Sequence, residues 1–197
     1  GLTEPEAGSD ATNSKTTGVL SDDGKHYILN GQKIFISNGG WADIFTVALK
    51  IDGKFSSIVV EKGTPGFEIG KEEKKMGMEG SSTVPLYFTD CKVPVENLLG
   101  EVGEGAGPAF CALNIGRFKL GASAIGGMAL GMDHAVDYAK NRKAFGQNIS
   151  DFSSIQDKLA TCAILTYTLE STCYSVIGEQ TEAINKLDKD DPKFYVK

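Results

Sequence analysis

The stretch DIFTVALKIDGKFSSIVVE, residues 43–61, decides the fold of the first half of this chain. Two runs rich in β-branched and aromatic residues, Asp43–Ile51 and Phe55–Glu61, flank the dipeptide Asp52-Gly53. This dipeptide is a strong hairpin signal, because both of its residues tolerate the positive φ that a two-residue turn requires. The stretch therefore predicts two antiparallel strands.

Similar runs lie on both sides of this hairpin. They are Tyr27–Asn30, Lys33–Ser37 and Pro85–Thr89. Turn residues separate the runs, at Asp23-Gly24, Asn30-Gly31, Asn38-Gly39-Gly40 and Pro65-Gly66. Five closely spaced strands predict a compact β-barrel or sandwich over residues 1–101.

After about Gly105 the hydrophobic period becomes helical. Apolar residues follow 3-4 spacing and form one helix face, which comprises Ile115, Phe118, Ala122, Ile125, Ala129, Met132 and Val136. A second periodic run extends from Ile155 to Val176, and Ser153 with Gln156 predicts a capping box at its start.

The first helix contains many glycines, including Gly121, Gly126, Gly127 and Gly131. Each costs about 1 kcal/mol relative to alanine, which predicts close helix packing or room for a ligand. Two long amphipathic helices do not close a bundle on their own. Residues 102–197 are therefore predicted to form an incomplete helical bundle, in which PKFYVK (192–197) starts another helix. The predicted fold class is α+β.

Composition excludes several classes of protein. The chain has 197 residues, of which 41% are hydrophobic, and a net charge of -6, which argues against a nucleic-acid binder. No apolar run approaches the roughly 20 residues that cross a bilayer. The four cysteines lack C-x-x-C spacing and predict reduced thiols, and two histidines do not suggest a metal site.

One candidate functional segment lies at residues 2–10, LTEPEAGSD. Its hydroxyls and backbone N–H groups could bind a polar heterocycle or a phosphate, and Gly8 permits a close approach. The alternative is a capped surface turn, since the same residue types form turns. Glu4, Glu6 and Asp10 are expected to be solvated or to cap a helix rather than to be catalytic.

Two further segments could carry chemistry. KIFISNGG (33–40) places an aromatic ring beside a hydroxyl, although Phe35 taken alone is more typical of a core residue than of a stacking platform. RKAFGQ (142–147) follows the glycine-rich helix, and Arg142 offers a planar fork for a phosphate or carboxylate. The alternative for this segment is a set of cations that complements the helix dipole.

Six segments in order make the chain resemble the acyl-CoA dehydrogenase family, flavoenzymes that oxidise fatty acyl-CoA thioesters. They are LTEPEAGSDA, NGQKIFISNGG, KKMG, VPVENLLGEVGEG, NIGRF and RKAFGQ. Several of them are most similar to the very-long-chain branch. The resemblance implies a middle β domain (1–101), followed by the first part of the C-terminal helical domain (102–197), with the family's N-terminal helical domain outside this chain.

The resemblance also implies site residues. Positions expected to bind FAD are Leu2, Thr3, Gly8, Ser9, Phe35, Ile36, Ser37, Arg142, Ala144, Phe145, Phe152 and Ser153. Those expected to contact the acyl-CoA are Ser9, Asn114, Gly116 and Arg117. Phe35 stands where the family usually has a Trp that stacks on the flavin ring. Arg142 is expected to reach the FAD of a neighbouring subunit, which implies a homodimer.

The implied reaction converts a long- or very-long-chain fatty acyl-CoA to the trans-2-enoyl-CoA in fatty acid β-oxidation, with electrons passing to an electron-transferring flavoprotein. Gly116 occupies the position of the base in one branch and has no side chain, so the catalytic Glu is expected beyond Lys197, and the chain alone is expected to be inactive. The branch implies a mitochondrial location, with possible peripheral membrane association. A respiratory-complex assembly factor and an acyl-CoA oxidase remain alternatives.

Overall fold

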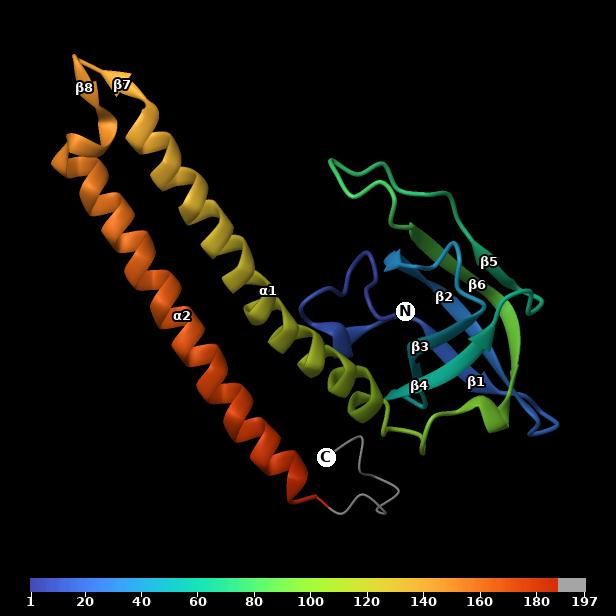
Figure 1. Cartoon of the computed structure of the whole chain (residues 1–197). Helices are drawn as coiled ribbons and strands as arrows, with labels where there is room; N and C mark the ends of the chain where they lie inside the picture. The colour runs from blue at the N-terminus through green and yellow to red at the C-terminus, as the bar shows by residue number, and fades with distance from the viewer. Residues whose placement is uncertain (188–197) are drawn as a thin grey trace. The chain divides into compact units, whose positions relative to one another are not determined.

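The computed structural model describes residues 1–187, apart from the side chains of Pro108, Ala112, Ile115 and Phe118. The helix predicted at residues 192–197 lies outside this range. The chain separates into two compact units, Gly1–Cys111 and Ala112–Lys197. The first is built from strands, and the second contains most of the helical residues (Figure 1).

A single six-stranded mixed sheet forms the strand unit, in the order β4-β3-β1-β2-β6-β5. Neighbours are antiparallel except for β1 and β3. The strands are β1 (Thr17–Leu20), β2 (His26–Ser37), β3 (Ile44–Ile51), β4 (Lys54–Glu61), β5 (Phe67–Ile69) and β6 (Thr83–Pro94). Short 3-10 turns lie at Ala11–Asn13 and Val95–Asn97.

The β3–β4 hairpin confirms the prediction made from residues 43–61. Ile51 pairs with Lys54 across a two-residue turn. Asp52 and Gly53 in that turn have φ values of 50° and 74°. Two consecutive positive φ angles define the turn type whose twist matches that of the flanking strands.

The turn predicted at Asn30-Gly31 is wrong, because β2 runs through it as one 12-residue strand. The register of β2 against β6 shifts between Leu29 and Gly31, which marks an irregularity instead of a chain reversal. Gly31 has φ 145°, and a Cβ there would lie 2.6 Å from Oγ1 of Thr16. Glycine is required here so that two backbones can approach closely.

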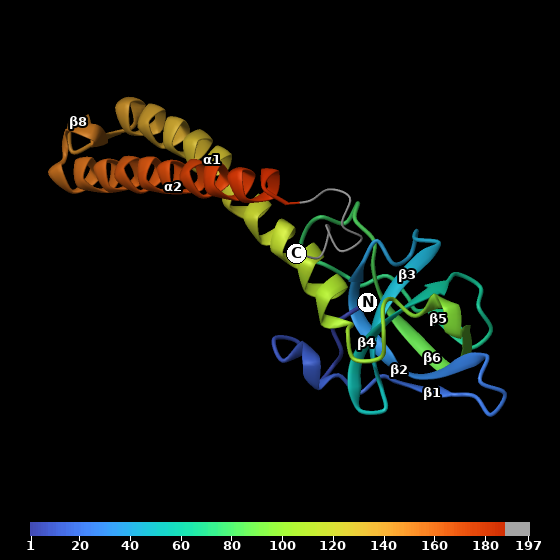
Figure 2. The ribbon, with the colours of Figure 1, turned by 90° about the horizontal axis from the view of Figure 1, so that it is seen from below.

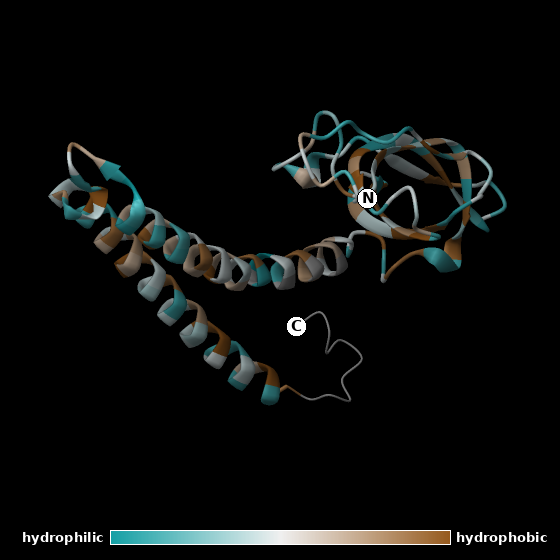
Figure 3. Ribbon diagram, turned by 45° about the horizontal axis from the view of Figure 1, so that its top comes forward, coloured by the Kyte–Doolittle hydropathy of each residue, from teal (hydrophilic) through white to brown (hydrophobic). Residues whose placement is uncertain are grey.

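The core of the strand unit lies between parts of the sheet that are not neighbours in the ladder. The ring of Phe45 in β3 meets the ring of Phe67 in β5, a strand that is not its neighbour, edge-on at 4.9 Å. Phe67 also stacks on Phe88 of the adjacent strand β6 at 5.1 Å. The sheet therefore curls until its apolar faces meet, as Figure 3 shows from one end. The α+β class is confirmed, but the ladder ends at β4 and β5, so the sheet is not a closed barrel.

Two long helices, α1 (Ala106–Asn141) and α2 (Ser153–Asn185), account for most of the rest. They run side by side in Figures 1 and 2. A small hairpin, β7 (Lys143–Ala144) and β8 (Gln147–Asn148), and a 3-10 turn at Ile149–Asp151 connect them. No helix among the described residues is long and apolar enough to cross a membrane.

Glycine in α1 has a visible packing role at one position. A Cβ at Gly121 would lie 3.3 Å from Sγ of Cys173 in α2, whereas one at Gly126, Gly127 or Gly131 would meet nothing within 4 Å among the described residues. The capping box predicted for α2 is wrong. Ser153 is the first helical residue rather than the cap, and the side-chain amide of Gln156 donates to the Ser150 carbonyl at 2.9 Å.

Candidate functional site

The segment Gly1–Glu4 lies between β2 and β3, in line with β1. The Gly1 nitrogen donates to the Thr46 carbonyl (2.8 Å), and Ala48 N–H donates to the Gly1 carbonyl (2.9 Å). On the other side, Ile34 N–H donates to the Thr3 carbonyl (2.9 Å). A backbone hydrogen bond therefore joins the candidate segment at residues 2–10 to the one at residues 33–40, next to Phe35.

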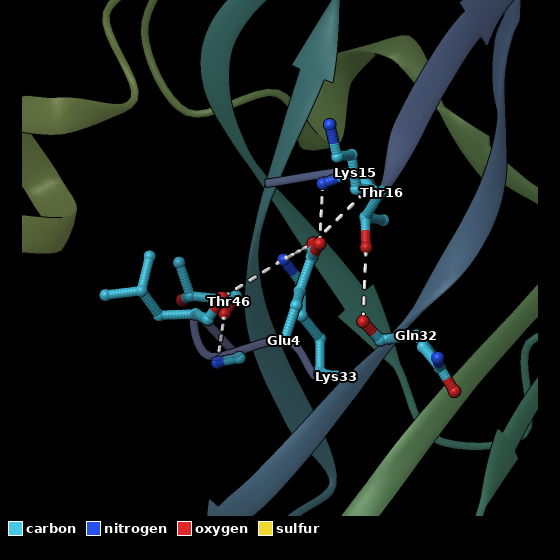
Figure 4. A network of polar contacts seen from close by, with 8 residues as sticks. Glu4, Lys15, Thr16, Gln32, Lys33 and Thr46 are labelled. Carbon is cyan, nitrogen blue, oxygen red and sulfur yellow. Dashed lines mark hydrogen bonds and ion pairs between the residues drawn. The ribbon is translucent and has the colours of Figure 1, made fainter. Parts of the chain in front are cut away.

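Glu4 is buried, with 4% of its surface exposed. Its carboxylate accepts hydrogen bonds from Lys15 N–H (2.5 Å), Thr16 N–H (3.1 Å) and Nζ of Lys33 (2.7 Å) (Figure 4). Burial raises the pKa of Glu4, but the hydrogen bonds from Lys33, Thr16 and Lys15 outweigh it and hold the pKa below its usual value. The expectation that Glu4 is a solvated or capping residue is wrong.

Lys33 is the cationic partner of Glu4 and is fully buried. Its Nζ also donates to the Leu2 carbonyl at 3.3 Å. Burial lowers the pKa of Lys33, and the contact with Glu4 opposes that shift. A buried charge is tolerated when it is paired and hydrogen-bonded, and Lys33 meets both conditions. We refer to Glu4, Lys33 and the Leu2 carbonyl together as the Lys33 clamp.

Phe35 lies on an irregular part of β2, where the register against β6 shifts between Lys33 and Ile36. Its φ is 56°, in the left-handed region that non-glycine residues seldom adopt. The side chain is 61% exposed, so the core interpretation of Phe35 is wrong. The shift leaves Phe35 and Ser37 exposed while Ile36 packs against the core.

The two candidate segments of the strand unit carry the hydroxyl side chains of Thr3, Ser9 and Ser37. Among residues 1–187, no hydrogen bond engages the side chains of Thr3, Ser9 or Ser37. Ser9 and Gly8 are exposed and follow a tight turn in which Glu4 and Ala7 pair across Pro5 and Glu6. A Cβ at Gly8 would meet nothing within 4 Å in the part of the chain that the structure describes, which leaves space beside the backbone there.

A pocket of about 200 Å³ lies beside the Lys33 clamp. Its lining residues are Glu4, Pro5, Glu6, Lys15, Thr16, Gly31 and Gln32. Thr16 and Gln32 both line the pocket, and the Thr16 hydroxyl donates a hydrogen bond to the Gln32 carbonyl at 3.3 Å. The pocket therefore separates the Pro5–Glu6 turn from β2, whereas the Leu2–Thr3 segment is hydrogen-bonded to that strand.

The other predicted site residues belong to α1 and the helical unit. Arg142 is exposed, and its backbone is held by Arg142 N–H to the Tyr138 carbonyl (2.8 Å) and by Ile149 N–H to the Arg142 carbonyl (2.9 Å). Ala144 ends β7. Phe145 occupies the hairpin turn, with φ 52° and 97% exposure, and its ring lies edge-on to Phe152 at 6.3 Å.

Three of the four residues predicted to contact the acyl-CoA, Asn114, Gly116 and Arg117, lie on α1, and the fourth is Ser9 of the strand unit. The Arg117 guanidinium donates to Oδ1 of Asn114 at 2.8 Å, which fixes two exposed side chains one helical turn apart. A Cβ at Gly116, between them, would meet no other described part of the chain within 4 Å. Ser153 is exposed at the start of α2. The structure thus groups Asn114 with Arg117, and Phe145 with Phe152.

Two family models match the chain. One describes the acyl-CoA dehydrogenase middle domain and matches residues 1–91. The other describes the acyl-CoA dehydrogenase C-terminal domain and matches residues 103–191. Together they cover most of the chain, and the residues between the two matches, 92–102, lie just before α1.

Individual relatives agree with the family models. A probable acyl-CoA dehydrogenase of Bacillus subtilis (strain 168) is 45% identical over 193 residues, which are 98% of this chain and 32% of the relative. The mitochondrial very long-chain specific acyl-CoA dehydrogenase of Homo sapiens is 46% identical over 185 residues, 89% of this chain and 28% of that protein. This chain therefore spans about a third of the length of these relatives.

A solved structure is similar over nearly the whole chain. The crystal structure of an acyl-CoA dehydrogenase from Bacillus anthracis, complexed with FAD, matches with a TM-score of 0.87 and 45% identity. The matched region makes up 99% of this chain and 34% of the Bacillus anthracis chain.

Proposed function

Because the chain belongs to the acyl-CoA dehydrogenase family, we propose that the whole protein is an FAD-dependent dehydrogenase of long- or very-long-chain fatty acyl-CoA. The observation that carries the proposal is the exposed Phe35 ring on an irregular strand, directly beside the Leu2–Thr3 segment. The reaction class is α,β-dehydrogenation to the trans-2-enoyl-CoA, as in fatty acid β-oxidation.

The residues of the strand unit fit a planar heterocycle with polar edges. Phe35 supplies an exposed aromatic face, and an aromatic ring favours offset stacking on another flat ring. The hydroxyls of Thr3 and Ser37 are available as hydrogen-bond partners for the edge of such a ring. Phe35 has less area than a Trp and no indole N–H, so its stacking contact is weaker than a Trp would make.

Anionic parts of the cofactor would meet other residues. Gly8 and Ser9 form an open polar turn that suits a pyrophosphate, since backbone and hydroxyl groups can approach it closely. Arg142 offers a bidentate fork for the pyrophosphate of an FAD bound by a second copy. Leu2, Ile36, Ala144, Phe145, Phe152 and Ser153 complete the proposed FAD contacts.

FAD, when bound, supplies a hydride acceptor for the substrate β-carbon. The chain itself contributes binding and orientation, with Ser9, Gly116 and the Asn114–Arg117 pair proposed to contact the acyl-CoA. Gly116 cannot act as the base, because it has no side chain. The proton of the α-carbon is therefore proposed to go to a carboxylate elsewhere in the whole protein.

The proposed partners follow from the same family. They are a fatty acyl-CoA substrate, an electron-transferring flavoprotein as electron acceptor, and a second copy of the chain. Mitochondrial location and peripheral membrane association stay predictions, since the relatives include a bacterial protein as well as a mitochondrial one.

The test is anaerobic titration of the purified full-length protein with acyl-CoA thioesters of increasing chain length. We expect a yellow protein whose flavin absorbance is bleached by palmitoyl-CoA and recovers when an electron-transferring flavoprotein is added. A protein that binds no FAD, or whose flavin no acyl-CoA bleaches, would contradict the proposal and leave the assembly-factor role.

Two further measurements separate the remaining alternatives. Stoichiometric hydrogen peroxide in air would identify an acyl-CoA oxidase. The 197-residue chain by itself is expected to show no turnover, because no base is proposed within it, and measurable turnover would place the base among these residues.

A further inference from the structure

The Lys33 clamp connects the two segments to which the proposed flavin contacts of the strand unit belong. Glu4 directly follows Thr3, and Lys33 lies two residues before Phe35. The carboxylate and the ammonium group meet at 2.7 Å, in a place that excludes water from both side chains. Each end of this ion pair is thus within two residues of a group proposed to face the flavin.

We propose that Lys33 and Glu4 are positioning residues of the flavin site, which set where the Leu2–Thr3 segment lies relative to the Phe35 ring. The inference rests on the proposed function. It assigns the clamp a role in cofactor affinity that is separate from its contribution to folding.

The contacts of Lys33 support a positioning role. Its Nζ donates to the Leu2 carbonyl (3.3 Å) as well as to Glu4. This one side chain therefore contacts both the Leu2–Thr3 segment, which is proposed to face the flavin, and Glu4, which directly follows that segment. Ile34 N–H, one residue further on, donates to the Thr3 carbonyl (2.9 Å). The segment is therefore tied to β2 at three successive residues, immediately before the chain turns away at Pro5.

The irregularity of β2 gives the clamp a second effect. Lys33 still pairs with Leu86 of β6, and regular register resumes only at Ile36. Phe35 lies inside the shift with a left-handed φ, which costs free energy unless its surroundings hold it there. Lys33 is anchored from both sides, by β6 and by Glu4, and so fixes the point from which the irregular part of the strand begins.

Stability alone does not require an ion pair at this position. Well-packed apolar residues of similar volume often replace a buried ion pair without loss of stability, because they avoid the cost of removing two charges from water. Apolar side chains could fill the same space, but none could donate to the Leu2 carbonyl or accept from Lys15 and Thr16. The ion pair therefore contributes directional hydrogen bonds that apolar side chains lack, and such hydrogen bonds can hold a loop in one position.

The test uses the full-length protein and four variants: Lys33→Met, Glu4→Gln, the double variant Glu4→Leu/Lys33→Met, and Glu6→Gln as an exposed control. Two quantities are measured for each, namely the Kd for FAD from flavin fluorescence and the unfolding temperature of the FAD-free protein. We expect each clamp variant to weaken FAD binding at least about tenfold, which corresponds to about 1.4 kcal/mol of lost binding free energy. Glu6→Gln should stay within about twofold.

The double variant separates positioning from folding. We expect its FAD-free unfolding temperature to return to near that of the wild type, while its FAD affinity stays low. A double variant that binds FAD as tightly as the wild type would overturn the inference, because the polar contacts would then be dispensable.

If the double variant does not fold, Glu4→Gln decides, since glutamine keeps the shape of the side chain. Weaker FAD binding without a matching loss of FAD-free stability supports positioning, and unchanged FAD binding overturns it. A wild-type protein that binds no FAD is a different outcome, which contradicts the proposed function itself.

Discussion

The strand unit and the helical unit of this chain differ in how much of their apolar surface they bury. In the strand unit, residues from the five strands β2 to β6 enclose a continuous core, and side chains such as Leu29 and Ile58 are fully buried. In α2 no described residue is buried, and in α1 Ala139 is the one buried hydrophobic residue among those described. Large apolar side chains such as Leu130 and Ile164 remain exposed.

The helical unit therefore needs further protein surface to cover its apolar side chains more than the strand unit does. A curled sheet can satisfy its own apolar face, whereas two helices leave apolar stripes that further helices normally cover. The irregular, exposed part of β2 is therefore held by a complete core, while Phe145 and Arg142 are held only by a small hairpin and the ends of two helices.

Removing one charge of the clamp should produce the largest loss of stability. Lys33→Met leaves the Glu4 carboxylate buried without its cation, which costs about 3–5 kcal/mol. The matched control is Lys15→Met, whose exposed side chain is lost while its backbone N–H still donates to Glu4. Urea denaturation measures both, and we expect the control to change the free energy of unfolding by at most about 0.5 kcal/mol.

Truncation of one leucine in each unit tests the comparison directly. Leu29→Ala in the strand core should cost about 2–5 kcal/mol, because it leaves a cavity in a packed interior. Leu130→Ala on α1, where the side chain is 60% exposed, should cost at most about 0.5 kcal/mol. Equal losses in the two variants would mean that Leu130 is buried by a surface that these helices do not provide.

Acid should destabilise the strand unit through Glu4. The pKa of Glu4 is lowered from 4.5 in the folded state, so the unfolded state binds more protons than the folded state at pH values near and between the two pKa values. The stabilisation is complete above the unfolded pKa and is lost as the pH falls through the folded one. Its contribution to the pH dependence is at most about 1.4 kcal/mol per pH unit.

Glu4→Gln is the variant that isolates this titration. Urea midpoints measured from about pH 7 down to about pH 3 should fall less steeply for Glu4→Gln than for the wild type. Parallel curves would show that the pKa of Glu4 does not differ between the folded and the unfolded state.

A glycine substitution on α1 should have the smallest effect. Gly126→Ala should stabilise the helix by up to about 1 kcal/mol, since its Cβ meets no described atom. Gly121→Ala places a Cβ 3.3 Å from Sγ of Cys173, so part of that gain should be lost to crowding. Thermal unfolding followed by circular dichroism compares the two, and an equal gain at Gly121 would show that the helices separate easily there.

Local patterns predicted the parts of the fold that depend on neighbours in the chain. Asp52-Gly53 forms the expected hairpin, and the change from strand to helix periodicity near Gly105 corresponds to the start of α1 at Ala106. The prediction at Asn30-Gly31 was wrong because the same dipeptide occurs both in turns and in strand irregularities. The choice here depends on Thr16, the residue before β1, which lies against Gly31. β1 and β5 were missed because they are short and do not alternate clearly.

The Lys33 clamp was beyond the reach of sequence patterns. A lysine at the start of an apolar strand and a glutamate in a turn both look like solvated residues, and 29 residues separate them. The exposure of Phe35 was missed because an aromatic residue in an apolar run is typical of a core, and no sequence pattern marks the register shift between Lys33 and Ile36. The roles of the predicted FAD and acyl-CoA contacts stay predictions.

The most direct test of the central claim is a structure of the full-length protein with FAD bound. The account predicts that the flavin ring lies against the exposed face of Phe35, with its polar edge hydrogen-bonded to the Leu2–Thr3 segment and to Ser37. A flavin ring bound away from both the Leu2–Thr3 segment and Phe35 would contradict the account.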